Sequence, residues 1–147
     1  MEFGGRGDCI AMDIVGGRDS LFKTARCNSV ILTINDCFSR FALAIALPDQ
    51  TSETIIAAVI SHYIMVYGTP RRILTDQGRA FALELFHHFC ILFRIAKIRT
   101  SGYRPQSNGI CERFNQTLKH FLQRILSFNQ QVRWDQFFSF AVFTYNT

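Results

Sequence analysis

The sequence lacks the features that define several large classes of protein. It has no stretch of about 18 uninterrupted apolar residues, so no membrane-spanning segment is expected. The opening segment, residues 1–8, is polar and Gly-rich and therefore unlike a signal peptide. We expect a flexible segment at residues 1–8, followed by a single domain at residues 9–147.

Cysteine and histidine are too scattered for the common cross-linked or zinc-stabilised folds. The five cysteines are an odd number, lie far apart and include no Cys-x-x-Cys pair, which favours buried thiols in a reducing compartment over a disulfide framework. His87 and His88 are adjacent, whereas His62 and His120 are isolated. A structural zinc site needs four converging ligands, usually two close pairs, so none is expected.

Charge is present in moderate amount but is unevenly distributed. The 147 residues carry a net charge of +5, and 48% of them are hydrophobic, enough for a packed core. Between positions 94 and 133 the only acid is Glu112, against eight basic residues: Arg94, Lys97, Arg99, Arg104, Arg113, Lys119, Arg124 and Arg133. Such a field suits a phosphate backbone. An ordinary solvated basic surface is the alternative.

Hydrophobic periodicity predicts a mixed α/β domain. Alternating residues predict strands at 9–15, 29–34, 40–47, 71–75 and 95–99. Helical spacing, with capping residues and Gly or Pro stops, predicts helices at about 51–67, 80–92, 110–125 and from 132 onward. Residues 100–109 are rich in Ser, Gly, Pro and Asn and predict a loop. In the third strand, a row of alanines would let a helix approach closely.

Three carboxylates stand where chemistry is plausible. Asp13 lies inside an apolar strand, Asp76 where a strand meets a Gly turn, and Glu112 near the start of a helix. Each has an ordinary interpretation, as a solvated strand residue, a turn residue or a helix-start acid. Together they could converge at the ends of central strands, where repulsion between them would favour bound cations. Two Mg²⁺ ions about 3.5–4 Å apart could then clamp a phosphodiester exchange.

The helix that carries Glu112 has a polar face suited to nucleic acid. Glu112, Gln116 and Lys119 are spaced i, i+4 and i+7, away from the apolar stripe of Phe114 and Leu118. This face could serve both a metal and a DNA phosphate. Ordinary helix solvation remains the alternative for Gln116 and Lys119.

With 35 residues between Asp76 and Glu112, the chain resembles the D,D-35-E integrases of retroviruses and gypsy-type long-terminal-repeat retrotransposons. The most specific segments are Tyr103-Arg104-Pro105-Gln106-Ser107-Asn108-Gly109 and Glu112-Arg113-Phe114-Asn115, with Leu118-Lys119 following. Further matches are Met12-Asp13-Ile14-Val15-Gly16, residues 31–40, 68–70 and 74–78, Trp134 and Tyr145-Asn146.

The resemblance implies a ribonuclease-H-like α/β fold, a five-stranded mixed sheet flanked by helices. It implies a DDE polynucleotidyl transferase and endonuclease with Asp13, Asp76 and Glu112 as catalytic metal ligands, holding two Mg²⁺ ions, with Mn²⁺ as the other option. The reactions would be 3′-end processing and strand transfer of retroelement DNA into target DNA, in the nucleus, by a homodimer or larger multimer. DNA contacts are expected from Tyr103, Arg104, Asn108, Arg113, Gln116 and Lys119.

The chain also departs from the family pattern. Arg104 stands where many gypsy-type relatives have His, which keeps the loop basic. The zinc-binding N-terminal domain and the basic C-terminal domain of full integrases are absent, so we expect a core truncated near its C-terminal end. Two other interpretations stay open. One is a domesticated domain that binds DNA or protein without chemistry, and the other is a ribonuclease or transposase of the same fold.

Overall fold

The centre of the molecule is a five-stranded mixed sheet. The computed structural model describes residues 4–16, 23–76, 78–99, 105–127 and 133–147. The strands are β1 Cys9–Gly16, β2 Val30–Asp36, β3 Ala42–Leu47, β4 Arg72–Thr75 and β5 Ala96–Arg99. Their order is β3-β2-β1-β4-β5. β1, β2 and β3 pair antiparallel, whereas β1, β4 and β5 pair parallel. The predicted five-stranded mixed sheet is therefore confirmed.

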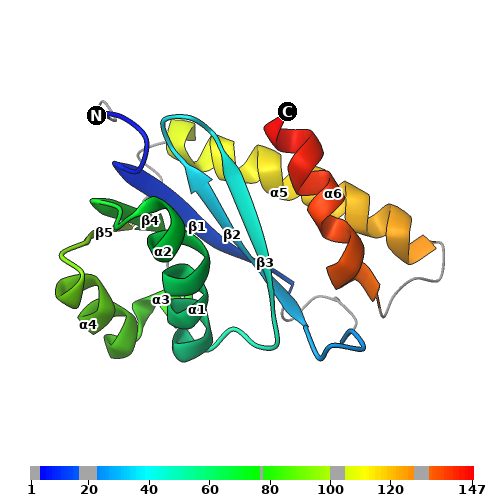
Figure 1. The fold of residues 1–147 in the computed structure, drawn as a ribbon, viewed down its shortest axis with the longest axis horizontal. Coiled ribbons are helices and arrows are strands. Elements are labelled where there is room, and N and C mark those ends of the chain that lie inside the picture. The colour runs from blue at the N-terminus through cyan, green and yellow to red at the C-terminus, as the bar shows by residue number, and fades with distance from the viewer. Residues whose placement is uncertain (1–3, 17–22, 77, 100–104, 128–132) are drawn as a thin grey trace.

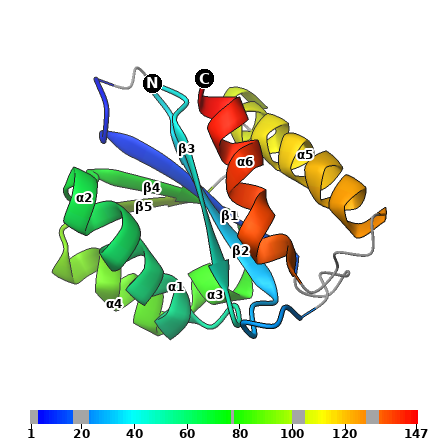
Figure 2. The same cartoon turned by 45° about the vertical axis from the view of Figure 1, so that its right-hand side comes forward.

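Helices form a layer on each face of this sheet (Figures 1 and 2). On one face lie α1 Ser52–Val59, the π-helical segment Ile60–Ile64, α2 Met65–Tyr67, α3 Arg79–Ala82 and α4 Glu84–Leu92. On the other lie α5 Pro105–Ser127 and α6 Trp134–Asn146. Within the described ranges, no helix combines the length and the apolar character needed to cross a bilayer.

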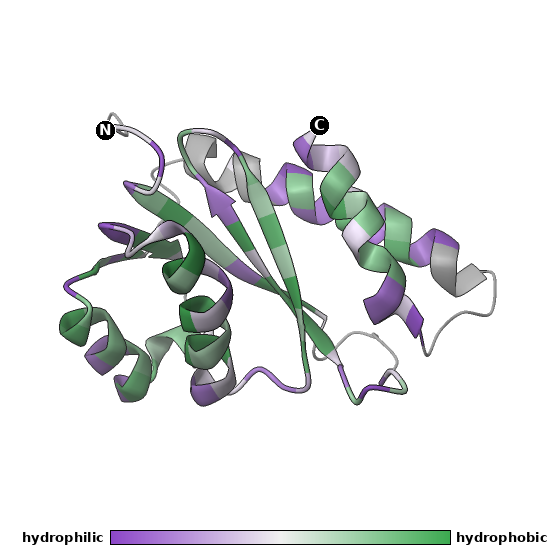
Figure 3. Cartoon of the chain, in the orientation of Figure 1, coloured by the Kyte–Doolittle hydropathy of each residue, from purple (hydrophilic) through white to green (hydrophobic). Residues whose placement is uncertain are grey.

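The two helical layers create two hydrophobic cores, because successive strand residues point to opposite faces. Ile10 and Met12 of β1 pack into the core beneath α1 and α4, whereas Val15 packs into the core beneath α5 and α6. All seven residues of β2 are buried, since this strand is covered on both faces. Figure 3 shows hydrophobic residues along the strands and a mixture of polar and apolar residues along α5.

The alanines of β3 receive α6, as predicted. Ala42 is buried in the core beneath α5 and α6, and Ala44 and Ala46 pack against that core. At the end of α6, the Asn146 side chain makes two hydrogen bonds to the backbone of this edge strand. Ala42 N donates to Asn146 Oδ1 and Asn146 Nδ2 donates to Ala42 O, each at 2.8 Å. Trp134 at the start of α6 is fully buried. Small residues on the strand thus allow a large aromatic helix to pack on it.

Several element boundaries differ from the predicted ones. The loop predicted over 100–109 is wrong from Pro105 onward, because α5 begins there. Proline is well suited to a first helical position, since the N–H that it lacks would have no partner there. The helix predicted over 80–92 is divided at Leu83, whose backbone is extended. The third strand starts at Ala42, because Arg40 has a φ of 63° that a strand does not accommodate.

Part of the predicted N-terminal segment contacts the sheet. Gly7 N donates to Asp36 Oδ2 at 3.0 Å, Arg72 N donates to Asp8 O at 3.0 Å, and the Asp8 carboxylate pairs with the Arg72 guanidinium. These contacts continue the alignment of β1 with β4. Flexibility of residues 1–8 stays a prediction.

Candidate active site

Asp13, within β1, and Asp76, directly after the last residue of β4, lie side by side on two parallel central strands. Met12 of β1 is in register with Thr75 of β4. The residue that follows each of them is an aspartate, Asp13 after Met12 and Asp76 after Thr75. Both side chains line one open pocket of about 780 Å³. The rest of its wall comes from Ile14 and Gly16 of β1, from the segment Asp49 to Ser52 before α1, and from the segment around α3, between Gly78 and Leu83. The structure therefore brings together two of the three predicted acids.

The Asp13 carboxylate is half-buried and held by two hydrogen bonds. Ile14 N donates to Oδ1 and Asn115 Nδ2 donates to Oδ2, both at 2.8 Å. Burial raises the pKa of Asp13, and the neighbouring Asp76 charge adds to this rise. The two hydrogen bonds and the Lys119 cation act in the opposite direction. The surroundings thus disfavour the charged form of Asp13. A cation bound beside the carboxylate would stabilise that charged form.

Asp76 is exposed and its orientation depends on a glycine. Gly78 N donates to Asp76 Oδ1 at 2.8 Å. A Cβ placed on Gly78 would lie 2.8 Å from that same oxygen, closer than a real Cβ contact. The absence of a side chain at position 78 therefore allows the backbone to approach the carboxylate and fix it in the pocket.

Asn115 is a site residue that the sequence reasoning did not single out. It lies on α5, is 8% exposed, and reaches Asp13 across 102 positions of sequence. Its Oδ1 is buried and has no hydrogen-bond partner among the described residues. The available signal was its spacing, because Asn115 follows Glu112 by three residues and precedes Lys119 by four, which places all three on one helical face.

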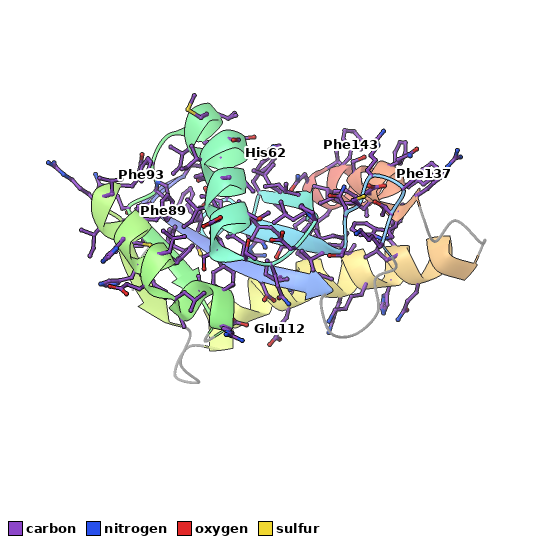
Figure 4. The ribbon with its side chains drawn as sticks, turned by 90° about the horizontal axis from the view of Figure 1, so that it is seen from below. His62, Phe89, Phe93, Glu112, Phe137 and Phe143 are labelled. Atoms are coloured by element: carbon purple, nitrogen blue, oxygen red, sulfur yellow. The ribbon has the colours of Figure 1, made fainter. Side chains whose placement is uncertain are left out.

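Glu112 is exposed on this face of α5, one turn before Asn115 (Figure 4). The structure does not group it with the two aspartates. Within the part of the chain that it describes, no three His, Cys, Asp or Glu side chains lie close enough together to hold a metal ion. Asp13 and Asp76 nevertheless offer hard oxygen ligands of the kind that Mg²⁺ prefers, and the electrostatics at Asp13 fit a cation.

The structure describes the side chains of three of the six predicted DNA-contacting residues. Arg113, Gln116 and Lys119 are exposed on α5. Asn108 lies in α5, but its side chain, like the whole of Tyr103 and Arg104, falls outside the described residues. The structure also shows that Lys97 does not share the surface of α5 with these residues. Lys97 donates its Nζ to Phe81 O and lies 5.4 Å from the centre of the Phe86 ring, against α4.

Comparison with known proteins gives a consistent result. The Integrase core domain family matches residues 5–105. Over 140 residues the chain is 23% identical to the retrovirus-related Pol polyprotein of transposon 412 from Drosophila melanogaster, covering 95% of this chain and 11% of that protein. Over 90 residues it is 37% identical to the Gag-Pro-Pol polyprotein of squirrel monkey retrovirus, covering 61% and 5%. The chain thus spans a small part of these relatives.

Comparison with solved structures also identifies integrases. The simian T-cell lymphotropic virus intasome in complex with PP2A regulatory subunit B56 gamma matches with a TM-score of 0.74 and 30% identity, covering 94% of this chain and 48% of that one. The HTLV-2 integrase catalytic core domain in complex with magnesium, in its dimeric form, gives 0.70 and 24%, covering 97% and 88%. The fold is therefore ribonuclease-H-like, as predicted. With more than half of its length matched by the family, the chain belongs to the Integrase core domain family.

Proposed function

We propose that this chain is the catalytic core of a metal-dependent polynucleotidyl transferase, which trims the 3′ ends of retroelement DNA and joins them to target DNA. The observation that carries the proposal is that Asp13, within β1, and Asp76, directly after β4, line one open pocket side by side. Divalent cations, two Mg²⁺ ions or alternatively Mn²⁺, would supply Lewis-acid stabilisation of the attacking and leaving oxygens. Magnesium bound to the HTLV-2 core supports this assignment.

In this proposal the side chains of the protein would hold the metal ions in position and balance their positive charge. Asp13 and Asp76 would be ligands, with Asn115 and Gly78 fixing their carboxylates through the hydrogen bonds described above. Glu112 would be the third ligand, since it is exposed one turn from Asn115, on the same helical face. Because the reaction is an in-line exchange, such positioning and charge stabilisation account for most of what the protein must do.

The DNA backbone would run along the polar face of α5. Lys119 is exposed on that face and close enough to Asp13 for its charge to act on that carboxylate, so a phosphate held by Lys119 would lie beside the pocket. Arg113 and Gln116, also exposed on α5, would add contacts. Tyr103, Arg104 and Asn108 would complete the interface on the basis of the family pattern alone. Integration of this kind would take place in the nucleus, which is therefore the proposed site of action.

A homodimer or larger multimer is the proposed assembly. Two large side chains on α6, Phe140 and Phe143, are 63% and 69% exposed. Figure 4 shows Phe143 on the outer side of α6, away from α5. The HTLV-2 core occurs in a dimeric and a trimeric form. By contrast, Trp134 and Phe138 of the same helix are buried in the core beneath α5 and α6.

Resolution of branched DNA tests the proposal. This substrate needs only reversal of the joining step, so a core alone can be examined with Mg²⁺ or Mn²⁺. We expect cleavage by the wild type, none by Glu112→Gln, and wild-type cleavage by Glu84→Gln, which changes an exposed glutamate on α4. DNA binding without cleavage by the wild type would instead support a domesticated, non-catalytic domain.

A further inference from the structure

Two thiols face each other where β1 begins and β2 ends. Ile10 of β1 pairs with Asp36 of β2, and the next residues outward are Cys9 and Cys37. Cys37 N donates to Cys9 O at 3.0 Å, which extends the antiparallel pairing by one position. The two Sγ atoms are 3.6 Å apart, and both residues are in the thiol form. No other pair of thiols is in contact among the cysteines that the structure describes.

The backbone at this position suits a disulfide. Facing residues of antiparallel strands have Cα atoms about 4.5–5.5 Å apart, within the roughly 4.4–6.8 Å range of natural disulfides. Closing the bond therefore requires the sulfurs to approach by about 1.5 Å, to the usual ~2.05 Å, without separating the strands. Side-chain rotation suffices for a movement of this size.

The surroundings favour reaction at Cys9. The Cys37 thiol donates a hydrogen bond to Cys9 Sγ, and this bond lowers the pKa of Cys9. The guanidinium of Arg72, the register partner of Cys9 on β4, acts in the same direction, whereas burial and the charges of Asp8 and Asp36 oppose it. A stabilised thiolate is the nucleophile in thiol oxidation. The neighbouring thiol can then act as the resolving group.

Burial limits which oxidants can reach the pair. Cys9 is 1% exposed and Cys37 6% exposed, in a small cluster with Ala11 and Leu74. Cys9 is the first residue of β1 and Cys37 directly follows the last residue of β2, and local opening there costs less than in the middle of a sheet. A small neutral oxidant is therefore the suitable reactant, rather than a bulky disulfide.

We propose that Cys9 and Cys37 form a reversible dithiol–disulfide couple that responds to peroxides. Cys9 sulfur attacks hydrogen peroxide, giving a sulfenic acid and releasing one water. The Cys37 sulfur then attacks that sulfenic sulfur, forming the S–S bond and releasing a second water. Overall, two thiols lose two electrons and two protons while one peroxide becomes two waters. A dithiol reductant reverses the change.

Oxidation should also stabilise the fold, because it joins residues 28 positions apart. The loop-closure relation gives a decrease in the unfolding equilibrium constant of roughly 400-fold for a loop of this length. Cross-linking the first strand to the second at one end of their pairing would show as a higher urea midpoint for the oxidised chain than for the reduced chain.

The test is to treat the purified 147-residue chain with hydrogen peroxide and to map its cysteines by mass spectrometry without reduction. We expect a loss of 2 Da, one Cys9–Cys37 cross-linked peptide, and complete reversal by dithiothreitol. Cys27→Ser, at an exposed cysteine, and Cys90→Ser, at a buried one, should leave the cross-link unchanged. Cys37→Ser should abolish it.

Two results would overturn the proposal. One is peroxide modification of the exposed Cys27 while Cys9 and Cys37 both remain thiols. The other is a cross-link that joins either of them to a different cysteine, including Cys111, whose side chain lies outside the described residues. Mapping of the wild-type chain alone decides between these outcomes, so the conclusion does not depend on whether the Cys37 variant folds.

Discussion

Replacing Asn115 by Leu separates its role in the site from its role in the fold. The substitution removes the donor to Asp13 Oδ2 but keeps a side chain of similar size. Losing a hydrogen bond to a charged group costs about 1.5–3 kcal/mol. The same change removes the buried Oδ1, which has no partner among the described residues and carries a penalty of about 1–3 kcal/mol. These contributions offset each other, so we expect a net stability change within about 1 kcal/mol.

The effect of Asn115→Leu on metal binding and cleavage should be larger than its effect on stability, because no second contribution offsets the lost hydrogen bond in the site. Asp13 would keep only its bond from Ile14 N and would be free to turn out of the pocket. Losing a group that orients a metal ligand typically weakens metal affinity or activity 10–100-fold, about 1.4–2.7 kcal/mol. Manganese binding, measured from the electron paramagnetic resonance signal of unbound Mn²⁺, and branched-DNA cleavage should both fall by this factor.

Two further variants make the interpretation specific. Gln123→Leu removes an exposed amide from the same helix and should change neither readout. Asn115→Asp places a second carboxylate against Asp13, so it should destabilise the metal-free chain, and added Mn²⁺ should restore part of that stability. If Asn115→Leu binds Mn²⁺ and cleaves DNA like the wild type, the orienting role is wrong.

Three other changes test neighbouring parts of the site. Gly78→Ala should lower the rate of DNA cleavage roughly 10–100-fold by displacing the Asp76 carboxylate. Gly5→Ala, where an added Cβ meets open space, should leave the cleavage rate unchanged. Equal cleavage rates for the two variants would refute the steric argument. Lys119→Ala should reduce the slope of log affinity for DNA against log salt by about 1, and an unchanged slope would mean no phosphate contact. Asp13→Asn should raise urea stability at pH 7 in EDTA, because burial and Asp76 raise the pKa of Asp13 and so destabilise its charged form. This advantage should shrink as the pH falls through that raised pKa, where the folded wild type gains a proton; a pH-independent difference would contradict it.

The sequence by itself determined the layers of this protein. Alternation along β1 assigned Ile10 and Met12 to one face and Asp13 to the other, and the alanines of β3 indicated a closely packed helix. These features follow from local periodicity, which depends only on the two-residue repeat of a strand. The positions of Asp13 inside a strand and of Asp76 at the end of another could likewise be predicted from the sequence, as could the polar face of α5.

Only the tertiary structure decided which side chains meet. The Asn115–Asp13 bond joins residues 102 positions apart, and the turn of Lys97 toward Phe81 and Phe86 removes a cation from the expected basic surface. The same holds for the start of α5 at Pro105, within a stretch whose composition favours a loop. Composition and periodicity describe local preferences, whereas these outcomes depend on how α5 and α4 pack on the sheet and on which polar groups that packing brings into hydrogen-bonding distance.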